Sequence, residues 1–211
     1  MSGFKSFAQE TRIKLGGLTI LAGTNSSGKS SIMQPLLMMK QTLEATYDPG
    51  ALLLDGPNVS FTSGEQFITK LRASHLTLNQ FTIFMRIETM NLKSQFQWSP
   101  QNGVSIKSQS YGNPNPDTDI TLWPDMNSED ISQQENLFRD FSPNGFGVVR
   151  ERCFLILEKG EEAVAFGILN LTGLLRSIIH VQGVRGNPER IYKTAAVQGS
   201  MFTGRFENYV A

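Results

Sequence analysis

The chain has 211 residues, 39% of them hydrophobic, and its 19 basic side chains balance 19 acidic ones. This balance argues against a protein that binds nucleic acid or anionic membranes through its overall charge. The length allows one large domain or two small ones. Cys153 is the only cysteine, which excludes a disulfide framework within the chain and favours a reducing, cytoplasmic setting.

No stretch of the sequence is predicted to cross a membrane. The first fifteen residues lack the apolar core of a signal peptide. Residues 163–181 form the longest apolar stretch, but Asn170, Arg176 and His180 interrupt it. An arginine at the bilayer centre costs about 2.5–3.5 kcal/mol, so we interpret this stretch as part of the protein core.

The first segment with a clear pattern is a predicted pair of strands. Over residues 4–15, Ile13 and Leu15 alternate with charged side chains, which indicates a strand. Gly16 and Gly17 predict a turn. Residues 18–22 then form a short apolar run, which is typical of a strand buried on both faces of a parallel sheet.

The next segment matches a phosphate-binding motif. Residues 23–30 fit the spacing G-x-x-x-x-G-K-[ST] of the P-loop of NTPases. Apolar residues then recur at helical spacing from Ser30 to about residue 46. A strand, this loop and a helix in direct succession are the context that the motif requires, so we predict that the chain binds a nucleoside triphosphate.

The residues of the motif suit this chemistry. Gly23 and Gly28 allow the backbone to turn tightly and to approach an anion closely. The N–H groups of the loop and the positive end of the helix would face the phosphates. Lys29 would reach the β- and γ-phosphates, and the Ser30 hydroxyl would ligate Mg²⁺. The predicted ATP-binding residues are Gly23, Thr24, Asn25, Ser26, Ser27, Gly28, Lys29, Ser30 and Ser31.

The middle of the chain is predicted to be a β lobe. Residues 52–55 imitate an apolar strand that ends in an aspartate, but Gly56 and Pro57 follow at once, so we interpret them as a short strand that leads into a turn. From Leu76 onward, apolar and polar residues alternate, and Asn102-Gly103 is a hairpin signal. This pattern predicts an antiparallel meander with one solvent-exposed face.

The last third contains an acidic stretch and a basic one. Residues 111–147 hold seven acids and one arginine, a net charge of −6, and their weak periodicity predicts a long flexible loop, with one short helix near Phe138 and Phe141. A hairpin of residues 150–158 and 163–168 and a helix over residues 169–177 follow.

Several of these segments together resemble a known family. Gly3-Phe4-Lys5-Ser6-Phe7, the run 18–22 and the loop 23–31 resemble the N-terminal lobe of SMC/RecF/OLD-like ABC-type ATPases. Residues 52–57 and 184–190 look like segments of the bacterial "AAA family ATPase" proteins that are often found in anti-phage defence loci. The resemblance implies an ATPase head, in which a second head closes the site over the γ-phosphate.

The sequence also departs from this family. It has no L-S-x-G-Q/E signature and no apolar strand that ends in Asp-Glu. Residues 153–158, which end in Glu158, come nearest, but Lys159-Gly160 follows directly, so a hairpin strand is favoured. In the family, the missing parts lie C-terminal of the segment seen here. The chain therefore resembles the first half of a head, and its catalytic carboxylate is unknown.

Other candidate residues have two readings each. Gln66 is a candidate for the glutamine that touches Mg²⁺ in ABC-type sites, although a surface turn is favoured. Lys5 either reaches toward the nucleotide, as the resemblance implies, or is solvated. Residues 176–205 carry a net charge of +4, from five basic side chains and one acid, which suits nucleic acid phosphates but suits a solvated face better. His75 and His180 lack partners for a metal site.

The predicted fold is therefore α/β, a P-loop NTPase of the ABC-type head class (N-terminal lobe) with a mostly antiparallel β subdomain. Residues 1–211 are interpreted as a partial head: a P-loop core (1–60), an antiparallel lobe (61–110), the acidic loop (111–147), and a hairpin, helix and basic segment (148–211).

The predicted function is the binding of ATP and Mg²⁺ to drive head association in a bacterial defence or DNA-transaction complex, with hydrolysis incomplete in this chain alone. The expected partner is a second head, in a homo- or hetero-oligomer, or a C-terminal half; an effector nuclease or nucleic acid is a further candidate. The alternative is a non-hydrolysing regulatory subunit that uses ATP as a structural ligand. A small-molecule kinase is disfavoured by the strand before the P-loop and by the lack of an arginine-rich lid.

Overall fold

The computed structural model describes residues 1–25, 27–71, 76–77, 79–87, 90–112, 119–134, 142, 144–164 and 166–181. Within these ranges the fold combines helices with three separate antiparallel sheets. The predicted segment 184–190, the glutamate at position 88, Phe138 and Phe141, and most of the basic segment 176–205 lie outside the described residues.

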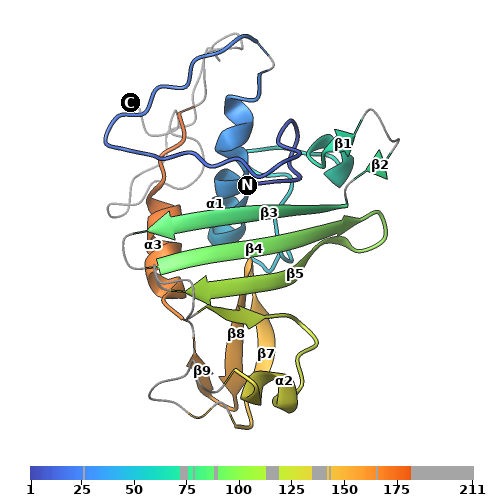
Figure 1. The fold of residues 1–211 in the computed structure, drawn as a ribbon, viewed down its shortest axis with the longest axis vertical. Coiled ribbons are helices and arrows are strands. Elements are labelled where there is room, and N and C mark those ends of the chain that lie inside the picture. The colour runs from blue at the N-terminus through green and yellow to red at the C-terminus, as the bar shows by residue number, and fades with distance from the viewer. Residues whose placement is uncertain are drawn as a thin grey trace.

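The central element is an antiparallel four-stranded sheet (Figure 1). Its strands are β3 (Gln80–Ile87), β4 (Met90–Ser99), β5 (Gly103–Gly112) and β6 (Ile120–Leu122), paired in that order. The β4–β5 turn contains Asn102 and Gly103, and Gly103 has the positive φ of +68° that such hairpin turns require. The predicted meander with this turn is confirmed.

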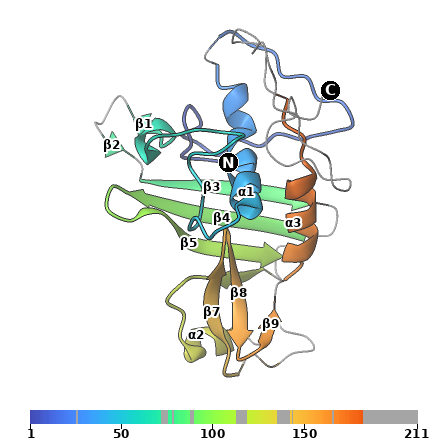
Figure 2. The ribbon, with the colours of Figure 1, turned by 180° about the vertical axis from the view of Figure 1, so that it is seen from behind.

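Two helices lie on one face of this sheet, as Figures 1 and 2 show from opposite sides. A 3-10 turn at Ser30–Ile32 leads into α1 (Gln34–Glu44), and α3 (Ile168–Ser177) packs beside α1. Pro35 is tolerated in the first turn of α1, where backbone N–H groups have no helical partner. The predicted helices after the loop and over residues 169–177 are confirmed.

A group of phenylalanine rings joins the N-terminus to this sheet. The Phe4 ring stacks on Phe67 at 5.6 Å between centroids, Phe67 meets Phe81 edge-on at 5.5 Å, and Phe81 stacks on Phe96 at 5.2 Å. All four side chains are buried. Aromatic pairs at this spacing add about 0.5–1.5 kcal/mol each beyond burial, so the N-terminal residues are firmly held against the sheet.

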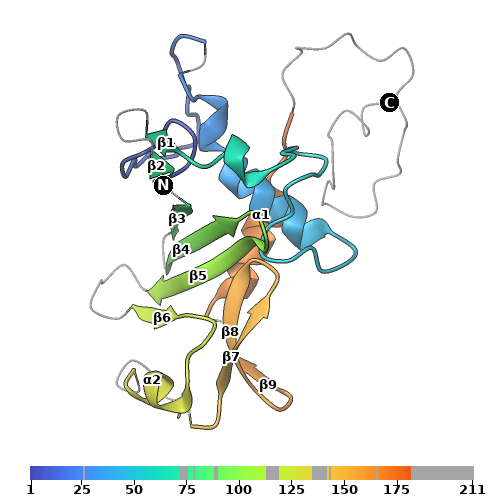
Figure 3. The ribbon, with the colours of Figure 1, turned by 90° about the vertical axis from the view of Figure 1, so that its right-hand side faces the viewer.

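A second sheet lies at the end of the molecule opposite the start of α1 (Figure 3). It consists of β7 (Gly147–Glu151), β8 (Phe154–Lys159) and β9 (Glu162–Val164). The prediction of one strand over residues 150–158 is wrong, because the chain reverses at Arg152, whose φ is +55°. The turn at Gly160 and the antiparallel β8–β9 pair are confirmed, as is the reading of Glu158 as part of a hairpin.

The acidic stretch 111–147 is not a loop throughout. β5 extends to Gly112, β6 adds a strand to the main sheet, and α2 (Ser128–Ser132) follows. Asn127 caps α2 by accepting hydrogen bonds from two backbone N–H groups, and Leu122 and Ile131 are buried in the core. The prediction missed these elements because strands and helices this short carry little periodicity.

The predicted strands at residues 4–15 and 18–22 do not form. The N-terminal residues make only isolated bridges, among them Ser2 with Thr82 and Phe4 with Ile68. No described strand pairs with residues 18–22, and Leu18 and Ile20 are 84% and 80% exposed. An apolar sequence alone does not make a strand, because the backbone also needs a neighbour to bond. The small strands β1 (Lys70–Leu71) and β2 (Leu76–Thr77) pair only with each other.

The predicted turn after residue 55 forms, but the short strand predicted over residues 52–55 does not. Asp55 bridges to Ser60, and the N–H of Gly56 donates to the Val59 carbonyl at 3.0 Å. The side-chain amide of Gln41, from α1, bonds the carbonyls of Leu53 and Val59 and fixes this turn against the helix. Asp55 therefore ends no parallel strand and has no catalytic position.

Candidate functional site

The loop before the 3-10 turn wraps around the side chain of Lys29. The Lys29 ammonium donates to the carbonyl oxygens of Gly23 at 2.7 Å and Thr24 at 2.6 Å, and to the Ser27 hydroxyl at 3.5 Å. Both ends of the motif therefore meet at one cation. These hydrogen bonds hold the loop closed. A bound anion could replace the carbonyl oxygens as the partner of Lys29, because an ammonium group bonds a charged acceptor more strongly than a neutral one.

The two motif glycines stand where a side chain would collide. At Gly28 the backbone φ is +92°, and a Cβ would lie 2.5 Å from the Ser6 hydroxyl. At Gly23 a Cβ would lie 2.8 Å from the Ser27 hydroxyl. A serine hydroxyl can rotate away from such a contact, so the positive φ values, +92° at Gly28 and +158° at Gly23, are what favour glycine at these positions.

Backbone donors of the loop remain available. The N–H of Ser31 donates to the Gly28 carbonyl at 2.9 Å, which starts the helical turn. Among the described residues, none accepts a hydrogen bond from the N–H groups of Gly28, Lys29 or Ser30. Successive free N–H groups at the start of a helix attract anions because their dipoles point the same way.

A pocket of about 340 Å³ opens beside this loop. Small-molecule sites begin at about 300 Å³. Its lining comes from two separate parts of the chain, the N-terminal segment and the loop: Lys5, Ser6, Asn25, Ser27, Gly28, Lys29, Ser30 and Ser31. The described lining holds two lysines and no carboxylate, so this part of the pocket is positively charged and suits an anion.

Lys5 has an uncommon backbone conformation that two hydrogen bonds hold in place. Its φ is +49°, which is uncommon for a residue other than glycine. Its N–H donates to the Phe67 carbonyl at 2.6 Å, and its own carbonyl accepts from the Thr69 hydroxyl at 2.9 Å. The ammonium lies 4.7 Å from the centre of the Phe61 ring. Partial burial lowers the pKa of Lys5 from its ordinary value.

The structure therefore brings most of the predicted site residues together and leaves out others. Gly23 and Thr24 each contribute a carbonyl to Lys29 but do not line the pocket, and Ser26 lies outside the described residues. Ser30 is exposed at the pocket, where its hydroxyl is accessible to a metal ion, and Ser31 is buried at 9% exposure. Ser6 was not predicted, although the G-F-K-S-F opening contained the signal.

Gln66 lies outside this pocket. It ends the short 3-10 turn Gly64–Gln66, and its side-chain amide exchanges hydrogen bonds with Thr62 at 2.8 Å and 3.0 Å. This is the surface turn that the sequence favoured over a metal ligand. Among the described residues, no group of three or more His, Cys, Asp or Glu side chains could hold a metal ion.

No model of a protein family, no curated protein and no solved structure matches this chain. Within the described residues, none of the helices has the length and apolar character needed to span a bilayer.

Proposed function

We propose that this chain is an ATP-binding lobe of an ABC-type ATPase head, as the resemblance of its motif implies. The observation that carries the proposal is the loop 23–31 itself, in which Lys29, two glycines with positive φ and backbone N–H groups without an acceptor among the described residues adjoin a pocket whose described lining has no carboxylate. These are the groups that bind phosphate in P-loop proteins.

The residues present fit ATP and Mg²⁺. Lys29 would exchange the Gly23 and Thr24 carbonyls for β- and γ-phosphate oxygens, and the N–H groups of residues 28–30 would bind the same phosphates. Ser30 would supply one oxygen ligand to Mg²⁺, which takes its other ligands from water and phosphate. Lys5, which also lines the pocket, adds a second positive charge.

The exposed run 18–22 supports the part of the proposal that concerns partners. Leu18 and Ile20 have the sequence of a buried strand, yet they are among the most exposed apolar side chains of the described chain. We infer that a second head or a C-terminal half supplies the neighbouring strand, and that ATP binding at the adjacent loop promotes this association. A cytoplasmic defence or DNA-transaction complex, with an effector nuclease as a possible component, fits the family resemblance.

A non-hydrolysing regulatory subunit is the second candidate. It is favoured by one observation: among the described residues, none of those that line the pocket is a carboxylate. Such a chain would hold ATP as a structural ligand and turn it over no faster than the background rate. A turnover assay with and without an added partner separates this candidate from the first.

The decisive experiment measures ATP affinity by calorimetry in the presence of Mg²⁺. We expect Lys29→Ala to remove most of the affinity while the melting temperature without nucleotide stays close to that of the unmodified chain. Lys107→Ala is the matched control, because Lys107 is an exposed lysine on β5 and does not line the pocket. Unchanged affinity in Lys29→Ala would show that the loop does not bind nucleotide.

A further inference from the structure

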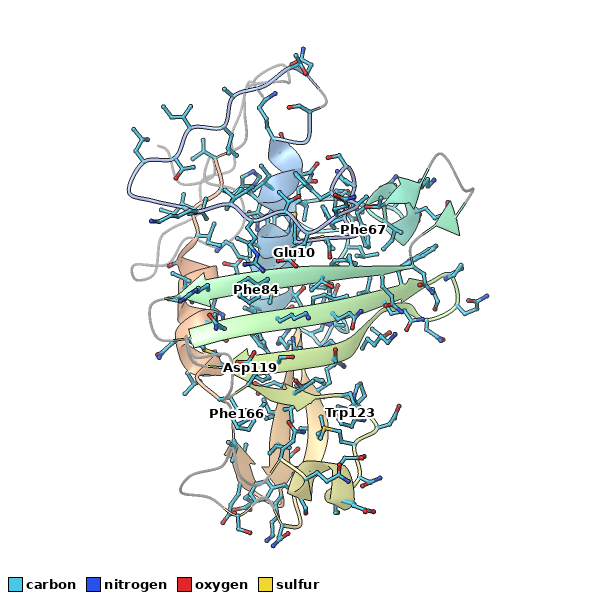
Figure 4. All side chains as sticks on the ribbon, in the orientation of Figure 1. Glu10, Phe67, Phe84, Asp119, Trp123 and Phe166 are labelled. Atoms are coloured by element: carbon cyan, nitrogen blue, oxygen red, sulfur yellow. The ribbon has the colours of Figure 1, made fainter. Side chains whose placement is uncertain are left out.

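The second face of the main sheet is left uncovered by the two helices. α1 and α3 pack on one side (Figure 2), and in Figure 1 the open side of β3, β4 and β5 faces the viewer. Phe81 and Ile83 point into the core, so the residues between and after them, Thr82 and Phe84, point to the open face. Figure 4 labels Phe84 on β3.

This open face carries positive charge without compensating acids in its strands. Arg86, Lys93 and Lys107 are exposed on β3, β4 and β5, and residues 80–87 and 90–112 contain no Asp or Glu. The described carboxylates beside it are Glu10 and Asp119, which lies next to the end of β5. Glu10 pairs with Arg12 at 2.6 Å, and Arg12 and, to a smaller extent, Lys93 lower the pKa of Glu10. The face is therefore basic although the chain as a whole is neutral.

The charges are arranged around an exposed aromatic ring. Phe84 is 41% exposed and lies directly opposite Lys93 in the β3–β4 register. Lys93 in turn lies opposite Ser110, whose hydroxyl bonds that of Thr121 at 2.9 Å. One row across four strands thus holds a ring, a cation and two hydroxyls. Neighbouring strands are about 4.8 Å apart, so a group stacked on the ring lies within reach of the cation.

Polar side chains without charge fill the next rows. The amide of Gln95 donates to the amide oxygen of Gln80 at 3.0 Å and accepts from the Ser108 hydroxyl at 3.4 Å. β5 contributes only small serine side chains to these rows, apart from Lys107 near the β-bulge between β4 and β5. The result is a solvent-exposed polar surface whose amides and hydroxyls can both donate and accept hydrogen bonds.

We propose that this face binds single-stranded nucleic acid. A base would stack on Phe84, while Lys93 and Arg86 would contact the flanking phosphates, and the glutamine and serine side chains would bond base edges or sugars. Sheet surfaces bind single strands in this way because every base has a face that stacks on a ring. The bases of a duplex are stacked on one another and are not available to Phe84. Acidic side chains carry no ring that could stack on Phe84. The exposed ring therefore favours a single strand over these two partners.

The proposal is tested by fluorescence anisotropy with a labelled oligothymidine of about 12 nucleotides, a length within the range bound by single-strand-binding folds. The unmodified chain should bind the probe, and more weakly at about 200 mM than at about 50 mM salt. Phe84→Ala should weaken binding about fivefold or more, since stacking dominates such contacts. Lys93→Ala and Arg86→Ala should weaken binding and also reduce its salt dependence.

Matched controls separate this surface from other features of the chain. Tyr47→Ala removes an aromatic ring that is 61% exposed elsewhere, and it should bind the probe normally. Phe84→Tyr should retain binding, because the ring can still stack. Lys29→Ala should also retain binding, so failure of the nucleotide site and failure of this face give different results. Circular dichroism confirms that each variant is folded.

Three results would overturn the proposal. The first is absence of probe binding by the unmodified chain at low salt. The second is equal loss of affinity in Phe84→Ala and Tyr47→Ala. The third is equal or tighter binding of polyglutamate or of duplex DNA, which would assign the face to acidic peptides or to polyanions in general.

Discussion

The ammonium group of Lys29 donates a hydrogen bond of 2.7 Å to the carbonyl oxygen of Gly23, so the lysine near the end of the motif is bonded to the glycine that begins it. This hydrogen bond spans six residues and gives the loop its shape without a ligand. The same lysine must change partners when an anion binds. Under the proposed function, nucleotide affinity would therefore depend on how well the loop keeps its shape while the lysine is released.

The first prediction concerns Gly28. In Gly28→Ala, a Cβ would collide with the Ser6 hydroxyl and hold a non-glycine residue at a φ of +92°. Backbone strain of this kind costs about 1–3 kcal/mol. We expect a lower free energy of unfolding in urea and weaker ATP binding by calorimetry. Gly16→Ala is the control, because a Cβ there would meet nothing within 4 Å, and it should change neither quantity.

The second prediction separates two candidate Mg²⁺ ligands. Ser30→Ala should weaken ATP binding when Mg²⁺ is present and have little effect when EDTA is added, because only the metal complex uses the hydroxyl. Gln66→Ala should have no Mg²⁺-dependent effect, since the Gln66 amide is already bonded to Thr62. A Mg²⁺-dependent loss in Gln66→Ala would show that this turn rearranges when nucleotide binds.

The sequence was most informative where a signal is local. Helical spacing and strict alternation located α1, α3 and the meander, and the motif spacing located Lys29 and the loop that contacts it. These signals depend on neighbours a few residues apart. The residues of this loop could therefore be singled out one by one, except that Ser6 joins the pocket through a tertiary contact.

The errors arose where structure depends on distant partners. Residues 18–22 have the composition of a buried strand, but whether a strand forms depends on a neighbour that the sequence of the run does not specify. The turn at Arg152 gave no signal, because a positive φ is far more common for glycine than for arginine. β6 and α2 are short and are held mainly by burial of Leu122 and Ile131 against the core.

The third prediction concerns acid stability. Asp48 accepts two hydrogen bonds from Arg150, at 2.6 Å and 3.1 Å, and this contact lowers the pKa of Asp48 from 3.8 to about 2. A lowered pKa in the folded state stabilises the fold above pH 4, and this stabilisation is lost as the pH falls from about 4 to about 2.

The measurement is urea unfolding as a function of pH. The unmodified chain should lose more stability than Asp48→Asn between pH 4 and pH 2, and the two curves should run parallel below this window. Both partners are partly exposed, so the difference should be small and should decrease with added salt. Identical curves at all pH values would show that this pair does not stabilise the fold.

The fourth prediction concerns the contact between α1 and α3. Lys40 is fully buried, pairs with Glu44 one helical turn later and donates to the Arg176 carbonyl at 2.7 Å. Lys40→Ala should lower the free energy of unfolding by about 3–5 kcal/mol, because it leaves the Glu44 carboxylate buried without a cation. The double variant Lys40→Met with Glu44→Leu should lose much less. Equal losses in the single and double variants would contradict a role for the buried charge.

The last prediction is that this chain alone binds ATP but turns it over at close to the background rate. Phosphoryl transfer to water requires a held γ-phosphate, a placed Mg²⁺, an oriented water and neutralisation of the developing charge. Lys29, Ser30 and the loop N–H groups account for the first two. Within the part of the chain that the structure describes, no carboxylate lines the pocket, and Glu158 is exposed on β8, in the sheet at the opposite end of the molecule. A missing transition-state group is worth about 10³–10⁵ in rate.

We therefore expect a second head or C-terminal half that supplies these groups to raise turnover by a factor of this order, as measured by phosphate release, and to leave Lys29→Ala inactive. Robust Lys29-dependent hydrolysis by residues 1–211 alone would contradict this prediction and would direct attention to the glutamate at position 88, which lies outside the described residues.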